Sequence, residues 1–187
     1  MSARVAAAFE AVPRRGFLPK DQQRFAHHDN ALEIGYGATN SQPTTVRNML
    51  HLLEVEVGQR VLDVGSGSAW TTALLAHLVG PEGRVIGVEL VPELLEMGIA
   101  NLVDHWPQAS LHQAAPDVLG WPDLAPYDRI LVSADASHLP LSLIEQLEPG
   151  GVMVVPVRGV MHRISRTPDG HRAEQHGFYS FVPLRGG

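Results

Sequence analysis

The feature that most constrains the fold is a repeated alternation of short apolar strands and helices between residues 60 and 157. The predicted strands are RVLDVG (60–65), RVIGVEL (84–90), SLHQA (110–114), YDRILVSA (127–134) and GVMVVPV (151–157). Helical segments are expected between them, at 69–79, 92–105 and 140–147. Strands that are apolar nearly throughout are buried on both faces. The pattern therefore predicts an α/β fold with a mostly parallel sheet covered by helices on both sides.

The two ends of the chain depart from this alternation. Residues 158–167 and 174–184 have the pattern of strands with no helix between them, so we expect an antiparallel C-terminal edge on the sheet. Residues 2–12 and 44–54 have helical spacing, and Pro13 ends the first helix because proline removes a backbone donor. The stretch 14–43 has no sustained periodicity. We predict that it is an ordered lid on the substrate side, held to the core by its apolar residues Phe17, Leu18, Phe25, Leu32 and Ile34.

Length and composition restrict the number of domains and the classes of site. The 187 residues fit a single domain, 1–187, which we divide into an N-terminal helix and lid (1–43) and a core (44–187). Hydrophobic residues make up 44% and charged residues 18%, which excludes intrinsic disorder. The absence of cysteine excludes a disulfide framework, a thiolate zinc site and a cysteine nucleophile.

Charge and hydropathy restrict the partners and the cellular location that we expect. The formal net charge is −6 and the basic residues form no runs, so we expect no nucleic-acid partner. No apolar stretch approaches the roughly 20 residues of a membrane helix, so we expect no membrane partner. The first residues carry Glu10 in a short apolar segment, which favours an amphipathic helix over a signal peptide. We therefore expect a cytoplasmic protein, and a monomer.

The strongest local motif is VLDVGSGSAW, residues 61–70, where a predicted strand ends and a helix begins. Gly65 and Gly67 allow a tight turn and the close approach of a ligand, and the helix N-terminus offers unpaired N–H donors. A dinucleotide site requires a small third residue at position 70, which is Trp70. The spacing of Asp63, Gly65, Gly67 and Ala69 is instead typical of S-adenosylmethionine-dependent methyltransferases. A purely structural turn is the alternative.

Two further segments fit a nucleoside site. Glu89 ends the next strand, where a carboxylate can accept hydrogen bonds from both ribose hydroxyls of an adenosine. The alternative is an exposed glutamate at a strand end. The segment GATNSQP, 37–43, combines hydroxyls, amides and glycine. It suits a small polar pocket, or a turn in which Ser41 caps a helix that has Pro43 near its start. The residues alone do not choose between these two interpretations.

Taken together, these segments resemble the protein-L-isoaspartate O-methyltransferase family. The resemblance rests on VPRRGFLP, LEIGYGATNSQPTTV, RVLDVGSGSAWTTALLAHLVGPEGRVIGVEL, LGWPDLAPYDRILVSA, EQLEPGGVMVVPV and the terminal FVPL, in the family's order from about residue 9 to residue 184. It implies a Rossmann-like class I methyltransferase fold with a seven-stranded sheet. It also implies methyl transfer from S-adenosylmethionine, with S-adenosylhomocysteine as product, to the free carboxylate of isoaspartyl residues in damaged proteins or peptides, which are the expected partners.

The resemblance also assigns site residues by position. It makes Ser41 the catalytic residue, because Ser41 is the polar residue nearest the reacting carboxylate. The implied substrate-binding residues are Thr39, Asn40, Gln42, Phe181 and Val182. The implied cofactor-binding residues are Asp63, Gly65, Ser66, Gly67, Ser68, Trp70, Glu89, Leu90, Pro116, Asp117 and Val118.

The chain departs from the family pattern at several of these positions. Gly35, Tyr36, Gly37 and Ala38 replace the usual G-H-G-Q, and Asn40 replaces the isoleucine of T-I-S-Q-P. The family's adenine-side aspartate falls on Pro116, with Asp117 one place along. These changes keep two alternatives open: a carboxyl methyltransferase acting on another peptide aspartate or a small acid, and a non-catalytic module that binds an adenosine ligand.

Other chemistries have weaker support. A carboxylate acceptor is already ionised at neutral pH because its pKa is about 3.9, so the reaction requires no general base. The ten histidines include no H-x-H or H-E-x-x-H ligand spacing, and we expect no metal site. No G-x-S-x-G segment occurs, which argues against a triad hydrolase. An NAD(P) oxidoreductase is the weakest candidate.

Overall fold

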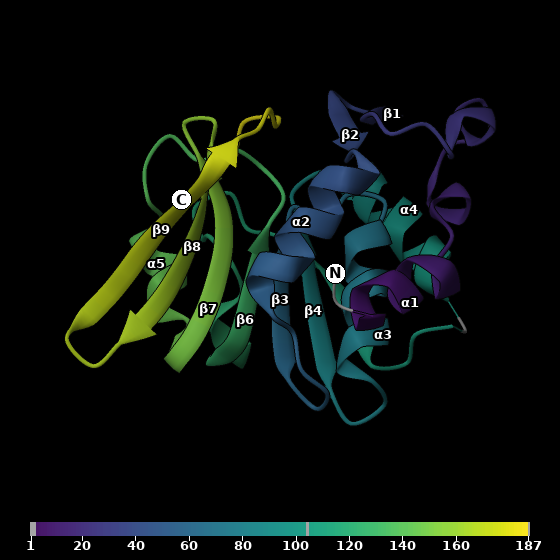
Figure 1. Ribbon diagram of the computed structural model, residues 1–187. Helices are drawn as coiled ribbons and strands as arrows, with labels where there is room; N and C mark the ends of the chain where they lie inside the picture. Colours follow the sequence, from purple (N-terminus) through teal and green to yellow (C-terminus); the bar gives the residue numbers. More distant parts are fainter. Residues whose placement is uncertain (1–2, 104, 187) are drawn as a thin grey trace.

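A computed structural model describes residues 3–103 and 105–186 of the 187. Its main sheet has seven strands in the order β5-β4-β3-β6-β7-β8-β9 (Figure 1). The strands are β3 (Arg60–Val64), β4 (Arg84–Glu89), β5 (Ala109–Gln113), β6 (Tyr127–Val132), β7 (Leu147–Val157), β8 (Val160–Thr167) and β9 (Gly170–Phe178). Neighbouring strands from β5 to β7 pair in parallel, and β8 pairs antiparallel with both β7 and β9. The predicted parallel sheet with an antiparallel C-terminal edge is confirmed.

The last strand begins and ends earlier than its sequence pattern predicts. It covers Gly170–Phe178 rather than 174–184. Beyond it, Tyr179 donates its backbone N–H to the carbonyl of Gly159, at 2.8 Å. Asp135, just after β6, then donates its N–H to the Val182 carbonyl and accepts one from Leu184. Residues 179–184 therefore leave the ladder of β8 and run beside the carboxyl end of β6.

Within residues 3–103 and 105–186, five α-helices accompany the sheet: α1 (Ala3–Ala11), α2 (Pro43–Leu53), α3 (Trp70–Val79), α4 (Pro92–Leu102) and α5 (Leu141–Glu145). In Figure 1, α1, α2 and α3 lie in front of the sheet and α5 lies behind it. Successive strand residues point to opposite faces. Val61 accordingly joins the core cluster beneath α1, α2 and α3, while Leu62 joins the cluster beneath α5. Residue 2 of the predicted helix 2–12 and residue 104 of the predicted helix 92–105 lie outside the described residues.

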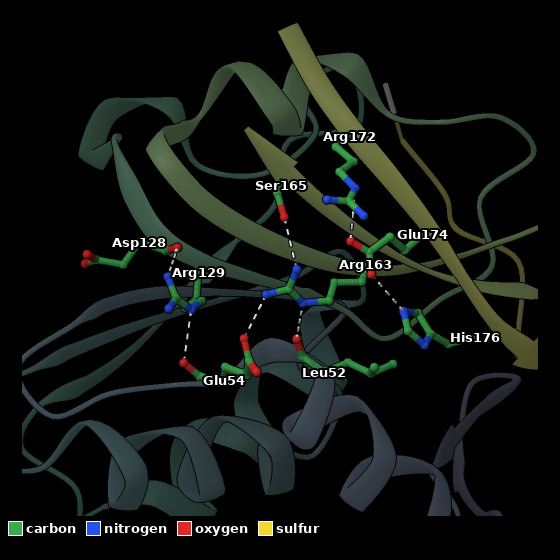
Figure 2. A network of polar contacts seen from close by, with 9 residues as sticks. All are labelled: Leu52, Glu54, Asp128, Arg129, Arg163, Ser165, Arg172, Glu174 and His176. Carbon is green, nitrogen blue, oxygen red and sulfur yellow. Dashed lines mark hydrogen bonds and ion pairs between the residues drawn. The ribbon is translucent and has the colours of Figure 1, made fainter. Parts of the chain in front are cut away.

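Two arginines fix the C-terminal end of α2 to the sheet. Arg163 on β8 donates to the Leu52 carbonyl at 2.9 Å and to the Glu54 carboxylate at 2.8 Å, and Arg129 on β6 donates to the Glu54 carbonyl (Figure 2). The last carbonyls of a helix have no partner within it, and cations are favourable there. Burial lowers the pKa of Arg129. These contacts set the position of α2, whose other end contributes to the candidate site.

The stretch 14–43 contains a β-hairpin that its sequence pattern does not indicate. Two short 3₁₀ turns, Arg14–Phe17 and Gln23–Phe25, precede β1 (Leu32–Gly35) and β2 (Ala38–Asn40). The hairpin turn places three successive residues, Gly35, Tyr36 and Gly37, at positive φ. Of the predicted anchors, Phe17, Leu18, Leu32 and Ile34 are buried and Phe25 is partly buried.

Among residues 3–103 and 105–186, no helix combines the length and the apolar character that crossing a membrane requires.

Candidate active site

The predicted cofactor residues meet at the carboxyl ends of β3 and β4. Ligands of open α/β sheets bind at this edge of the sheet. The backbone N–H groups of Gly65 and Ser66 both donate to the Val88 carbonyl, at 2.9 and 3.1 Å, which draws the chain after β3 across the end of β4. Gly65 and Gly67 have φ values of 77° and 53°, in the left-handed region that glycine enters without strain. This glycine loop, residues 65–68, leads into α3.

Glu89 is the buried acid of the site. It ends β4 with 7% of its surface exposed. One carboxylate oxygen accepts the Gly67 N–H at 2.8 Å and the other accepts the Val91 N–H at 2.9 Å. These two bonds fix the carboxylate between the glycine loop and the start of α4. Its predicted place beside a bound ribose is consistent with this geometry.

A cavity, here called the cofactor cavity, collects several of the predicted residues. Its lining includes Tyr36, Gly37, Ala38, Thr39, Gly65, Gly67, Glu89, Leu90, Ala114, Ala115, Val118, Leu119, Gly120, Ser133, Val182, Pro183, Leu184 and Arg185. Ser66, Ser68 and Trp70 line a smaller neighbouring space of about 30 Å³, here called the junction pocket. Pro116 and Asp117 line neither space. The cavity wall near them is formed by Ala115 and Val118, the residues on either side.

Asp63 lies inside the protein rather than on the cavity wall. It is fully buried, and one oxygen accepts the hydroxyls of Thr71 and Thr72 at 2.8 and 2.7 Å. Its other oxygen has no hydrogen-bond partner among the residues that the structure describes. Burial raises the pKa of Asp63 to about 6, against the opposing effect of the two threonine hydroxyls. This placement makes Asp63 a support for the start of α3, behind the glycine loop.

Ser41 lies on a separate groove beside the cofactor cavity. This acceptor groove has a volume of about 560 Å³ and is lined by Ala31, Thr39, Ser41, Gln42, Thr44, Thr45, Asn48, Ser133, Phe178, Tyr179, Ser180, Phe181 and Val182. It brings together Ser41 and four of the five predicted substrate-binding residues. None of its lining residues carries a formal charge. The hydroxyl and amide groups can donate hydrogen bonds to a carboxylate without pairing it with a cation.

The N-terminus of α2 is capped differently from the alternative that the sequence leaves open for Ser41. The N-cap position is Gln42, not Ser41. The exposed carboxylate of Asp29 accepts the Thr44 N–H at 2.8 Å and the Thr44 hydroxyl at 2.7 Å. These bonds lower the pKa of Asp29. Asp29 therefore supplies the anion that this helix end favours, and the Ser41 side chain is not used as a cap.

Asn40, the fifth predicted substrate residue, lies behind the groove and links the lid to the glycine loop. It is 5% exposed and lines the junction pocket. Its carbonyl oxygen accepts the Arg14 Nε–H at 2.7 Å, and its amide donates to the Ser68 hydroxyl at 3.2 Å. Arg14 is itself buried, and its guanidinium also donates to the carbonyls of His28, Asn30, Asn40 and Ser41. Burial lowers the Arg14 pKa to about 10, which leaves it charged at neutral pH.

Ser133 is the site residue that sequence reasoning misses. It lines the cofactor cavity, the junction pocket and the acceptor groove, as Thr39 also does. It directly follows β6, and its backbone N–H donates to the Val64 carbonyl at 2.9 Å. The available signal is its position at the carboxyl end of a predicted parallel strand next to the glycine-loop strand. A lone serine in an apolar segment has no other distinguishing pattern.

The cofactor cavity suits S-adenosylmethionine in its chemistry. Glu89 is an acceptor for vicinal hydroxyls, and Leu90, Val118 and Leu119 offer an apolar surface for a flat base. Of its lining residues only Arg185 is cationic, which fits a ligand without phosphate groups better than a dinucleotide. The residues that would hold the cofactor are therefore present.

A family model described as protein-L-isoaspartate(D-aspartate) O-methyltransferase matches residues 1–187. The chain belongs to this family. It is 45% identical to the protein-L-isoaspartate O-methyltransferase of Methanopyrus kandleri, over 99% of this chain and 84% of that protein. It is 43% identical to the one from Aeropyrum pernix, over 99% of this chain and 74% of that protein. The resemblance drawn from the sequence motifs is confirmed.

Solved structures of two members of the family have the same fold. One protein-L-isoaspartate O-methyltransferase matches 99% of this chain and 62% of its own, with a TM-score of 0.90 and 24% identity. A putative member from Plasmodium falciparum, solved with S-adenosyl-L-homocysteine, matches 100% of this chain and 92% of its own, with a TM-score of 0.88 and 24% identity. The Rossmann-like methyltransferase fold is therefore confirmed.

Proposed function

We propose that this methyltransferase transfers a methyl group from S-adenosylmethionine to the free carboxylate of L-isoaspartyl residues in damaged proteins and peptides. The observation that supports this function is the shared wall between the cofactor cavity and the acceptor groove. Thr39, Ser133 and Val182 line both spaces. A donor in the cavity and a carboxylate in the groove would therefore meet across these residues. The curated family members carry the same activity in their names.

When bound, S-adenosylmethionine would supply a methyl group on a positively charged sulfur. A carboxylate oxygen of the substrate would bond to that methyl carbon in line, while the carbon–sulfur bond breaks and its electron pair stays on sulfur. The protein's task is alignment and exclusion of water, because the acceptor needs no deprotonation. Ser41 orients the carboxylate by donating a hydrogen bond, and Thr39 and Gln42 line the groove beside it. Glu89, with Gly65 and Gly67 of the glycine loop and with Ala115 and Val118, would hold the cofactor. Leu90 and Val182 add apolar wall to the cofactor cavity, and Trp70 lines the junction pocket.

Residues 1–43 act, in this proposal, as the substrate-side part of one domain with the 44–187 core. The contacts of Arg14 and Asn40 with the Ser41 carbonyl and Ser68 support this assignment. Damaged proteins and peptides are the partners. We also propose that the protein is a monomer in the cytoplasm without a nucleic-acid partner, which its net charge of −6 supports. Sedimentation of the purified chain and fractionation of its host cells test these two points.

The test uses two peptides that differ only in isoaspartyl or aspartyl linkage, incubated with S-adenosylmethionine and followed by mass. We expect the isoaspartyl peptide alone to gain the mass of one methyl group in place of one proton. Ser41→Ala should lower kcat/KM by about tenfold to a hundredfold, the effect of losing one hydrogen bond to a charged group. Its affinity for S-adenosylhomocysteine should stay within about twofold of wild type. Ser142→Ala, on the exposed face of α5, is the matched control and should change neither value.

Each other result supports a different activity. Equal methylation of both peptides would favour a carboxyl methyltransferase of wider acceptor range, an outcome that the departures at Tyr36, Ala38 and Asn40 make worth testing. Cofactor binding without methylation of either peptide would favour a non-catalytic adenosine-binding module. Full activity of Ser41→Ala would remove the proposed role of that hydroxyl while leaving the activity in place.

A further inference from the structure

The two ends of the acceptor groove differ in chemistry. At one end, Thr39 and Ser133 are shared with the cofactor cavity, and Ser41 is shared with the junction pocket. Phe178 and Tyr179 line only the groove, so they lie away from the point where the cavity and the groove meet. One end therefore offers hydroxyl groups beside the methyl donor, and the other offers aromatic rings.

The aromatic end rests on an ordered backbone. Tyr179 is held by its N–H bond to the Gly159 carbonyl at 2.8 Å, and its hydroxyl accepts the Asn48 amide at 3.2 Å. Phe181 is partly buried and packs against the main core cluster. These contacts tie the wall of the groove to the turn between β7 and β8 and to α2. The rings are thus presented from a fixed surface rather than from a loose tail.

Phe178 is the exception in this wall, because its side chain is 88% exposed. Single exposed apolar residues are common on protein surfaces and need no explanation by themselves. Phe178 differs from the other exposed apolar residues in that it lines the same groove as Ser41. Val57, for comparison, is 65% exposed and lies in the turn between α2 and β3. Covering a ring at the end of a substrate groove with an apolar group removes apolar surface from water, which favours binding.

The absence of charged residues from the lining of the groove also favours an apolar ligand at this end. Its lining residues include no acid or base, and the polar ones are hydroxyls and amides. Just outside this lining, the Asp29 carboxylate accepts hydrogen bonds from Gln42 and Thr44 on the groove wall. An acidic side chain brought into the groove therefore loses water and meets a like charge. An apolar side chain meets no such penalty, and it finds the exposed ring.

We propose that Phe178 binds an apolar side chain that flanks the methyl-accepting residue, so that uncharged, apolar neighbours are preferred in the substrate peptide. This inference rests on the proposed function and adds a sequence preference to it. The occupant is a segment of the substrate itself, extended along the groove from Ser41 to Phe178. Its carboxylate lies at the hydroxyl end and its neighbouring side chain at the aromatic end.

The experiment compares isoaspartyl peptides whose residues on either side of the isoaspartate are leucine, glycine or glutamate. We expect wild type to have the highest kcat/KM on the leucine peptide and the lowest on the glutamate peptide. Phe178→Ala should lower kcat/KM for the leucine peptide by about fivefold to tenfold, through KM rather than kcat, as expected for losing one apolar contact. The glycine peptide should be unaffected. Phe178→Leu should restore most of the preference, and Val57→Ala should leave every value unchanged.

An unchanged ratio between leucine and glycine peptides in Phe178→Ala overturns the proposal, as does a wild type without preference. Aspartyl versions of the same peptides, run in parallel, report separately on the proposed acceptor. Binding of fluorescently labelled peptides in the presence of S-adenosylhomocysteine completes the test without turnover. Equal affinity of wild type and Phe178→Ala for the leucine peptide rejects the aromatic contact whether or not methyl transfer occurs.

Discussion

Asn40 uses both ends of its buried amide, one toward Arg14 and one toward Ser68. Replacing it with leucine keeps the side chain's size but removes a partner from the Arg14 guanidinium and from the Ser68 hydroxyl. Leaving buried polar groups unpaired costs about 1 to 3 kcal/mol. We therefore expect Asn40→Leu to lower the free energy of unfolding in urea by that amount, and to lower kcat because Arg14 also holds the Ser41 carbonyl.

Asn48→Leu is the control for this substitution. The Asn48 amide bonds to the Tyr179 hydroxyl at an exposed site, where water can replace the contact. Its free energy of unfolding should stay within about 0.5 kcal/mol of wild type. Equal losses in the two variants would show that the buried link from Arg14 to Ser68 has no special energetic role.

Asp63 should make the stability of the protein depend on pH in an unusual direction. Its folded-state pKa, about 6, lies above the ordinary value of 3.8, so the native state binds more protons than the unfolded state between these values. Stability is therefore lost as pH rises through this window, by up to about 3 kcal/mol, and is level above it. Asp63→Asn removes the titrating carboxyl group and with it this pH-dependent contribution to stability. We expect the free energy of unfolding of wild type, relative to Asp63→Asn, to fall between pH 4 and pH 7 in urea titrations. A constant difference would contradict the raised pKa.

At the scale of single residues, the sequence predicts which residues belong to the site better than it predicts what each side chain contacts. Glu89 lines the cofactor cavity because it ends strand β4. Gly65 and Gly67 line it because they form the left-handed turn after strand β3. Asp63 shares their motif, yet its carboxylate turns inward to Thr71 and Thr72. Ser133 is missed because its role depends on the neighbouring strand, which local spacing does not reveal.

Among the elements, the hairpin of β1 and β2 and the segment 182–185 wall the cofactor cavity from two sides. The enclosed volume is about 130 Å³. Small-molecule sites usually measure about 300 Å³ or more, so we infer that one of these walls moves to admit an adenosine ligand. The hairpin, residues 32–40, is the longer of the two walls, and it rests on the glycine loop through Ile34, whose side chain lies 3.1 Å from where a Gly67 Cβ would be.

Hydrogen exchange tests which wall moves. We expect S-adenosylhomocysteine to slow amide exchange in residues 32–40 by about tenfold or more, because a bound ligand stabilises the closed arrangement. The turn between β8 and β9 provides an internal control and should exchange at an unchanged rate. Protection of residues 182–185 alone would instead assign the movement to the C-terminal segment.

Element boundaries follow the sequence where burial dictates them. The strands of the parallel sheet and helices α2, α3 and α4 lie within a few residues of their predicted limits, because a continuous apolar run or a helical face specifies each one. The hairpin escapes prediction because strands of four and three residues are too short to establish a period of two. The end of β9 is misplaced because 179–184 looks like a strand but pairs with the loop after β6.

For the whole molecule, the alternation of apolar strands with helices predicts the class of fold and the cover of helices on both faces of the sheet. The strand order β5-β4-β3-β6-β7-β8-β9 is a different kind of information, since no local pattern specifies which strands become neighbours. The family resemblance supplied the seven-stranded architecture, and the order places β3, β4 and β6 side by side. That adjacency brings the glycine loop, Glu89 and Ser133 to one edge of the sheet.

The β9 edge of the sheet has a consequence for a protein whose proposed substrates are damaged chains. An edge strand can recruit any extended chain as an additional strand, the first step of co-aggregation. Strand β9 occupies that edge, and Arg172, Glu174 and His176 project from it (Figure 2). A kink in the pairing of β8 with β9, between Val160 and His162, adds irregularity beside it. These features make the β9 edge a poor template for any extended chain, the proposed substrates included.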